Sequence, residues 1–123
     1  MINILLVGIG GAFGAIARYL AGKISYEGVF PLITFFVNLT GCILIGFVAA
    51  FAFKKGINSN FLLFLKTGFL GGFTTFSTFS LEAVLLFQNK HYLEGGLYVV
   101  LSALFCILGV ILGQYLAFII CKN

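Results

Sequence analysis

The chain has 123 residues, of which 62% are hydrophobic and 8% are charged. Soluble domains carry about 25% charged residues, so this composition excludes a water-soluble globular domain. The formal net charge of +4 would suit a nucleic-acid partner if the cations formed a patch, but they are scattered near the ends of apolar stretches. That placement is typical of side chains that snorkel to lipid headgroups. We therefore expect an integral membrane protein.

Four apolar stretches divide the chain, and each is long enough to cross a hydrocarbon core about 30 Å thick as a helix. Pro31 stands at the start of the second stretch, where its missing N–H costs nothing. The connections are short, so consecutive helices are expected to be antiparallel neighbours in a single all-α transmembrane domain. The predicted helices cover about residues 4–21, 31–53, 61–87 and 93–120.

The positive charges give almost no signal for orientation in the membrane. The two sides carry Lys54, Lys55, Lys66 and Lys122 on the one hand and Arg18, Lys23 and Lys90 on the other. Near-balance predicts insertion in both orientations, which would permit an antiparallel homodimer. Four single-span helices are also expected to fill the centre of their own bundle, so an aqueous path would require a second copy.

Glycines recur four residues apart on single helix faces. Such pairs permit close approach of two helix backbones, and the sequence leaves open whether that packing lies within one copy or between copies. The pairs are Gly10 with Gly14, Gly68 with Gly72 and Gly109 with Gly113.

The third stretch is interrupted by the segment GGFTTFSTF at residues 71–79. Two adjacent glycines followed by hydroxyl residues make a poor continuous helix, and backbone groups freed at membrane depth need partners because lipid supplies none. One reading is a broken helix that lines a cavity or holds a small hard cation such as sodium on its carbonyls. The other is a kinked helix whose hydroxyls bond back to their own carbonyls.

Phe76 and Phe79 are three residues apart and should project from one side of a helix. An aromatic ring has a positive edge, and these two rings stand among Ser77, Thr78 and other hydroxyl residues. Ring edges and hydroxyl donors together could replace the water around a small anion, and weak multiple contacts would let it leave again.

Further polar side chains are in register on the second and fourth stretches. Thr34 and Asn38 are four residues apart, and Tyr98, Ser102 and Cys106 repeat every four residues along one face. These groups could line a path for an ion, although each one taken separately is better explained by hydrogen bonding between helices.

Two ionisable residues complete the set. Glu82 is a carboxylic acid well inside the third stretch, and intramembrane carboxylates are functional candidates by default. Arg18 stands near the end of the first stretch, where it could snorkel or attract anions. No catalytic constellation is present and no cysteines have metal-ligand spacing, so we expect neither an enzyme nor a disulfide framework, and we expect Cys42, Cys106 and Cys121 to behave as small hydrophobic residues.

The motifs GGAFGAIARY at 10–19, VNLTG at 37–41 and GFLGGFTTFSTF at 68–79 resemble the Fluc (CrcB) family of fluoride channels. The resemblance spans nearly the whole chain, and the third motif is its most specific part. It implies an antiparallel homodimer in a prokaryotic inner membrane, with passive export of fluoride and a structural sodium ion at the dimer centre.

The same resemblance assigns roles to individual residues. Phe76 and Phe79 would be the aromatic pair of the fluoride pathway and Asn38 the amide that contacts fluoride, while the backbone carbonyls of Gly71 and Thr74 from both copies would hold sodium. The remaining pathway residues would be Thr34, Ser77, Thr78, Tyr98, Ser102, Glu82 and Arg18. Cys106 departs from the pattern, because a hydroxyl residue is expected there.

Two other functions compete with a fluoride channel. A small proton-coupled transporter of the multidrug-resistance type has similar size, but such proteins typically carry an acid in the first helix, and none occurs in residues 4–21. A non-transporting assembly partner would explain the glycine faces but not the polar residues aligned on three helices.

Overall fold

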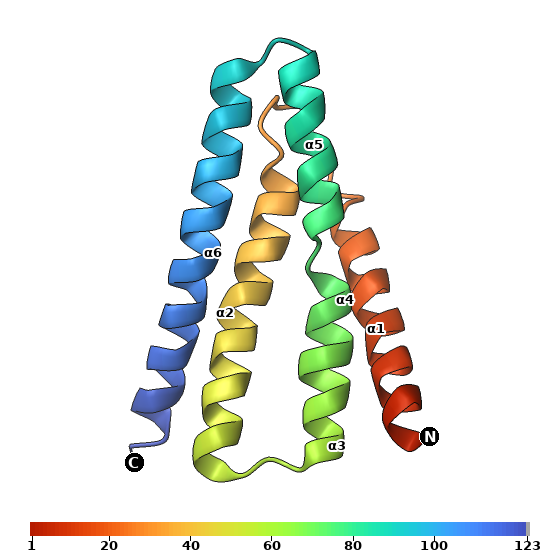
Figure 1. Cartoon of the computed structure of the whole chain (residues 1–123), viewed down its shortest axis with the longest axis vertical. Coiled ribbons are helices and arrows are strands. Elements are labelled where there is room, and N and C mark those ends of the chain that lie inside the picture. Colours follow the sequence, from red (N-terminus) through yellow and green to blue (C-terminus); the bar gives the residue numbers. More distant parts are fainter. Residues whose placement is uncertain (123) are drawn as a thin grey trace.

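The computed structural model describes residues 1–122, and all of the regular structure in that range is helical. Four long apolar helices have the length and composition to cross a membrane: α1, α2, a composite third helix and α6 (Figure 1). The elements are α1 (Ile2–Ala21), α2 (Leu32–Lys55), α3 (Ser59–Leu62), the π-helix η1 (Leu63–Leu70), α4 (Gly71–Phe73), α5 (Phe76–Gln88) and α6 (Tyr92–Ile120). The predicted number of long apolar helices is confirmed.

The ends of α2 and the start of α3 follow from local sequence. Pro31 precedes the first turn of α2, and Gly56 ends the helix with a left-handed backbone (φ 71°) while its N–H donates to Ala52 O. Such a left-handed C-terminal glycine is a common way for a helix to stop. The side chain of Asn58 then caps α3 by accepting from the N–H of Asn60 at 2.9 Å.

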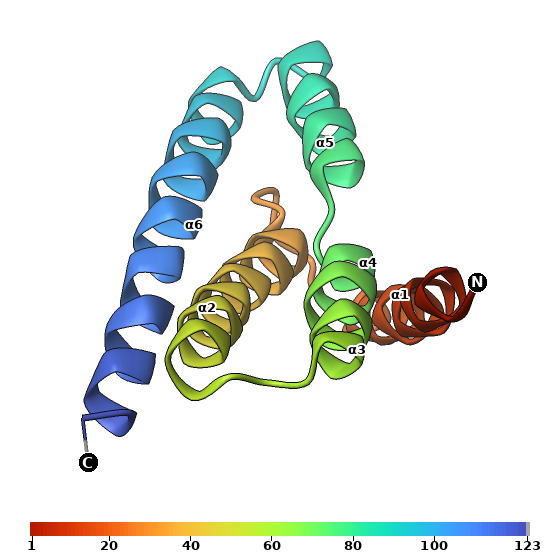
Figure 2. The same ribbon diagram turned by 60° about the horizontal axis from the view of Figure 1, so that its bottom comes forward.

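The chain runs up and down, as the short connections predict. Both ends of the described chain and the α2–α3 connection lie at one end of the molecule, and the other two connections lie at the opposite end (Figure 1). However, consecutive helices, which were predicted to be antiparallel neighbours, are not the main packing partners. α1 packs along η1 and α4, and α2 packs along α6, whereas α1 and α2 touch very little (Figure 2).

Glycines explain this pairing of alternate helices. A Cβ added to Gly14 would overlap the backbone of Phe69, and one added to Gly113 would overlap the backbone of Ile43. The backbones of the two helices in each pair therefore approach more closely than any side chain would allow. The question left open by the sequence is answered: the pairs 10/14, 68/72 and 109/113 all face helices of the same chain.

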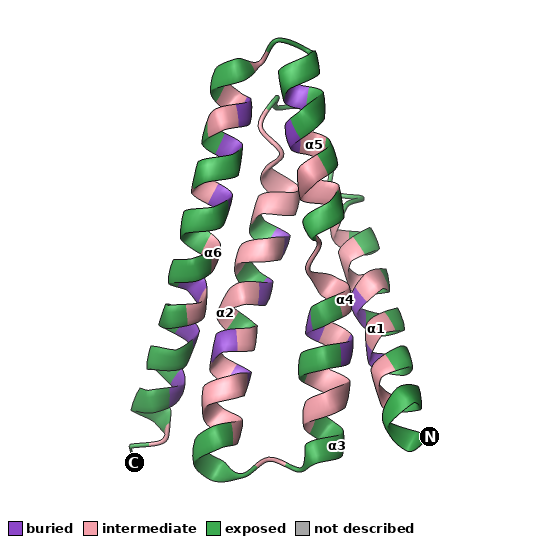
Figure 3. Ribbon diagram, in the orientation of Figure 1, coloured by how far each residue is buried: buried purple, intermediate pink, exposed green. Residues whose placement is uncertain are grey.

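The interior of the molecule is sparse, and the expected filling of one bundle by its own side chains is not observed. In the most apolar window of each span, only 11% to 22% of the residues are buried inside the chain. Figure 3 shows these buried residues as isolated patches. The main buried cluster consists of Ala83, Leu86 and Tyr98. The two helix pairs leave open cavities between them, and their outer faces require lipid or a second copy.

Replacing Gly14 with Ala tests the packing of α1 on the third helix. The added methyl group meets the Phe69 backbone, so we expect Gly14→Ala to lower the free energy of unfolding by about 1–3 kcal/mol, the usual cost of overpacking. Gly8→Ala is the matched control, because a Cβ there has no neighbour within 4 Å, and the better helix propensity of Ala should leave it neutral or slightly stabilised. Thermal unfolding of both variants in detergent compares them; equal stability would contradict this packing.

Candidate functional site

The third membrane helix is broken at Thr74 and Thr75, which we call the break. Both residues have extended backbones, with φ −76°, ψ 155° at Thr74 and φ −147°, ψ 121° at Thr75. Figure 1 shows the ribbon between α4 and α5 losing its coil there. The Thr74 hydroxyl does bond back to Leu70 O at 3.0 Å, as a kinked helix would require, but two consecutive extended residues make this a break.

Asn38 of α2 pairs with the backbone of the break. Its Nδ2 donates to Thr75 O at 3.0 Å, and its Oδ1 accepts from Thr75 N at 2.8 Å. One amide side chain thus replaces the partner that Thr75 N–H loses at the break and adds a second donor to Thr75 O. Since an unpaired backbone group costs several kcal/mol in lipid, we regard this pair, the Asn38–Thr75 clamp, as the main support of the break.

Thr75 also starts α5. Its Oγ1 accepts from the N–H of Thr78 at 3.2 Å and donates to the Thr78 hydroxyl at 3.0 Å. This is an ordinary N-cap, in which a side-chain oxygen satisfies one of the free N–H groups of a helix start. The cap fixes the first turn of α5, which carries Phe76 and Phe79.

The clamp and the cap leave two carbonyl groups free. In a continuous helix Thr75 N would donate to Gly71 O and Thr78 N to Thr74 O, but both N–H groups are diverted to side chains. Within residues 1–122, no hydrogen bond reaches either carbonyl. The neighbouring Gly72 O accepts instead from Arg18 Nε at 3.2 Å, so Arg18 anchors the end of α4.

Glu82 is held by two hydroxyl groups from different helices. Thr34 Oγ1 donates to its Oε1 at 2.8 Å, and Tyr98 OH donates to its Oε2 at 2.7 Å. Both distances are usual for O–H···O hydrogen bonds. This network ties α2 and α6 to α5 above the break.

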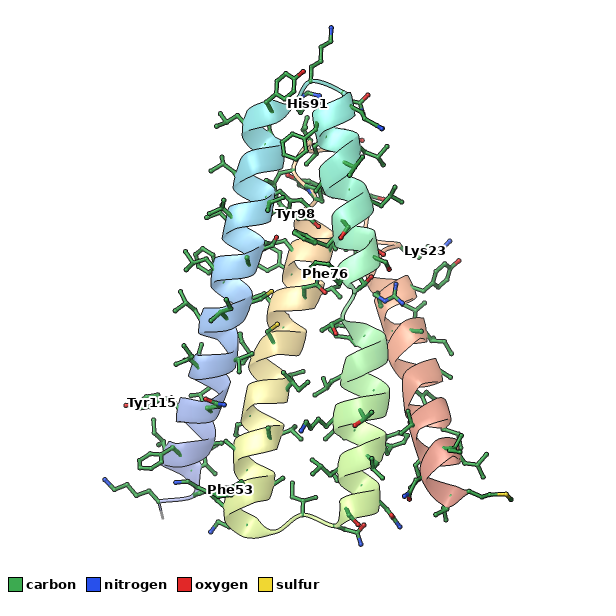
Figure 4. All side chains as sticks on the ribbon, in the orientation of Figure 1. Lys23, Phe53, Phe76, His91, Tyr98 and Tyr115 are labelled. Atoms are coloured by element: carbon green, nitrogen blue, oxygen red, sulfur yellow. The ribbon has the colours of Figure 1, made fainter. Side chains whose placement is uncertain are left out.

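The two phenylalanines at the start of α5 face in the same direction, as their spacing predicts. Their ring centroids are 5.5 Å apart, and the Phe79 ring lies 5.1 Å from that of Tyr98. Tyr98 is completely buried, whereas Phe76 is 80% exposed. In Figure 4, Phe76 lies near mid-height with Tyr98 above it. The aromatic side chains therefore extend from the packed interior to an open face of the chain.

Two cavities flank the break, and Thr75 lines both. The larger one, of about 710 Å³, is lined by Arg18, Thr34, Thr78 and Glu82 among others. The smaller one, of about 400 Å³, is lined by Asn38, Phe76, Phe79, Ser102 and Cys106 among others. The hydroxyl oxygen of Ser102 is buried and has no hydrogen-bond partner among the described residues.

Most of the predicted site residues are thus brought together around the break. Ser77, Gly71 and Tyr98 line neither cavity. Ser77 and Gly71 are exposed, although the Ser77 hydroxyl lies 3.4 Å from Thr75 Oγ1, and Tyr98 is buried beside Phe79. Sequence reasoning missed the central position of Thr75, although the spacing of Thr75 and Thr78 is a recognisable N-cap signal. It also missed Cys42, which lines the smaller cavity beside Cys106.

These features define a class: a multi-pass membrane protein with four apolar spans, a helix broken at mid-length, and a cavity on either side of the break. Residues 5–114 match the family described as "CrcB-like protein, Camphor Resistance (CrcB)". The chain belongs to this family.

Curated relatives agree with that assignment over almost their full length. A protein of Ruminiclostridium cellulolyticum is 47% identical over 95% of this chain and 93% of its own. Proteins of Rhizobium meliloti and Helicobacter pylori strain HPAG1 are 45% and 44% identical, over 92% of this chain and 94% and 91% of their own. All three are named "Fluoride-specific ion channel FluC".

Substitution of Asn38 tests the clamp. Asn38→Leu keeps the size of the side chain but leaves Thr75 N–H unpaired and removes one of the two bonds to Thr75 O, so we expect a loss of about 1–3 kcal/mol of stability. Thr40→Val is a suitable control on the exposed side of the same helix. Hydrogen exchange of the Thr75 amide should become faster in Asn38→Leu alone; unchanged exchange would contradict the clamp.

Proposed function

We propose that this chain is a fluoride channel, through which fluoride leaves the cytoplasm passively. The names of its curated relatives support the proposal. The structural observation that carries it is the Phe76–Phe79 pair, which the break and the N-cap of α5 position in the wall of the smaller cavity.

The chemistry of the smaller cavity suits a small anion that must also leave. Its described lining contains no Lys or Arg, and a fixed cation at close range would hold fluoride too tightly for conduction. The lining offers instead positive ring edges, the second N–H of the Asn38 amide and the unpartnered Ser102 hydroxyl. Each of these groups attracts an anion weakly, and together they could replace its hydration water.

The larger cavity would serve as the entry on the other side of the break. Arg18 raises the local positive potential there, while its bond to Gly72 O keeps it at the cavity wall. Thr34, Thr78 and Glu82 continue the polar lining toward the α5–α6 end. Glu82 already accepts from Thr34 and Tyr98, so it competes with fluoride for these donors and would weaken binding at that end of the path.

Replacing either phenylalanine tests the pathway. We expect Phe76→Ile and Phe79→Ile to abolish fluoride efflux from liposomes that contain the purified protein, because isoleucine keeps an apolar side chain but has no positive ring edge. Phe53→Ile is the control, since Phe53 is 92% exposed at the far end of α2 (Figure 4). A fluoride electrode follows the efflux; normal rates in both pathway variants would contradict the assignment.

We also propose that the working unit is an antiparallel homodimer with sodium bound between the copies. Phe76 is exposed in a single chain, and a second copy would cover it. The balanced charges at the two membrane sides permit both orientations. The free carbonyls of Gly71 and Thr74 are hard oxygen ligands, and two from each copy would suit a sodium ion on the axis.

Gly71 offers a test of this dimer. A Cβ at Gly71 has no neighbour within 4 Å in its own chain, so Gly71→Ala should leave the fold of one chain intact but disturb a partner that approaches there. We expect a smaller dimer fraction by mass photometry, with Gly8→Ala unaffected, and a smaller fraction for the wild type when sodium is replaced by potassium. Equal dimer fractions in all cases would contradict both proposals.

A further inference from the structure

Cys42 and Cys106 are 64 positions apart in the sequence but line the same cavity from two helices that pack together. Both line the smaller cavity, Cys42 from α2 and Cys106 from α6. A Cβ built on Gly109, one turn beyond Cys106, would lie 3.5 Å from Cys42 Cβ.

A third polar group belongs to the same place. Ser102 precedes Cys106 by one helical turn, which puts the two side chains on one face of α6. Ser102 is 5% exposed, and its hydroxyl has no hydrogen-bond partner in the described chain. Two thiols, one from each helix, and a buried, unpartnered hydroxyl thus line the cavity.

The ligand class follows from the number and the softness of these groups. No cluster of three or more His, Cys, Asp or Glu residues that could hold a metal occurs within residues 1–122, so a four-coordinate zinc site is excluded there. Thiolates prefer soft cations, and two thiolates from opposite sides meet the needs of a two-coordinate ion such as Hg²⁺, Ag⁺ or Cu⁺. Binding is a ligand exchange: Hg²⁺ forms two Hg–S bonds and releases the two thiol protons, with no change of oxidation state.

We propose that Cys42 and Cys106 form a binding site for a two-coordinate soft metal cation, and that its occupation blocks the ion path. The metal would join α2 to α6 within the smaller cavity, beside Asn38 and Phe76, and fill space that a fluoride ion must cross. Binding depends only on the two thiols. The block rests on the proposed fluoride channel.

Metal binding is measured first, on the purified protein, with HgCl₂ as the probe. We expect one tight Hg²⁺ per chain in the wild type, seen as sulfur-to-mercury charge-transfer absorbance. Cys42→Ser and Cys106→Ala should bind roughly 100-fold more weakly, because each loses the second ligand held at high effective concentration. Cys121→Ser is the matched control and should bind as the wild type does. Equal binding by all four proteins, or none by the wild type, would overturn the site.

Fluoride efflux is measured second, with and without one equivalent of Hg²⁺, and each protein is compared with its own metal-free rate. The wild type and Cys121→Ser should be blocked, and Cys42→Ser and Cys106→Ala should not. A block that persists in both of these variants would overturn the pair as its cause. If the wild type binds Hg²⁺ but passes no fluoride even without it, the proposed channel fails while the metal site stands.

Discussion

The structure depends on how one stretch of broken helix is kept paired at membrane depth. Lipid offers no hydrogen bonds, so two extended residues in the third helix would be very costly without partners. Asn38 removes most of that cost, because its amide binds both the N–H and the C=O of Thr75. The polar residue of α2 and the irregular backbone of the third helix are therefore parts of one feature.

The site follows from that clamp in a few steps. With Thr75 fixed, its hydroxyl caps α5, and the first turn of α5 aims Phe76 and Phe79 at the smaller cavity. The same diversion of N–H groups leaves the carbonyls of Gly71 and Thr74 without partners. The aromatic surface proposed for the anion and the carbonyl groups proposed for the cation thus have a common origin. They lie within a few residues of each other in the sequence, and neither ion would need a charged side chain beside it.

Much of this arrangement was readable in the sequence. The apolar stretches predicted the spans, and the Gly71–Gly72 pair followed by hydroxyl residues marked the place of the break, although a kinked helix stayed an equal alternative until the extended backbones of Thr74 and Thr75 were seen. The pairing of alternate helices was not readable, since every helix is apolar on most of its surface and a glycine pair marks a close contact without identifying the partner helix.

The Asn38–Thr75 clamp and the shared cavity of Cys42 and Cys106 were missed for a related reason, because both involve segments that are far apart in the sequence. The clamp also uses the backbone atoms of Thr75, which every residue type has, so the sequence gives no sign of it. The openness of the molecule was also missed, because helix number alone does not determine how far one chain fills its own interior.

The central claim is that weak, neutral contacts around the break select and pass fluoride. The most direct test is the efflux of fluoride and of chloride from otherwise identical liposomes that contain only the purified wild-type chain, each anion being released through a cation shunt. The account predicts rapid loss of fluoride while chloride is retained, without any proton gradient. Equal efflux of the two anions, or fluoride efflux only when a proton gradient is imposed, would contradict it.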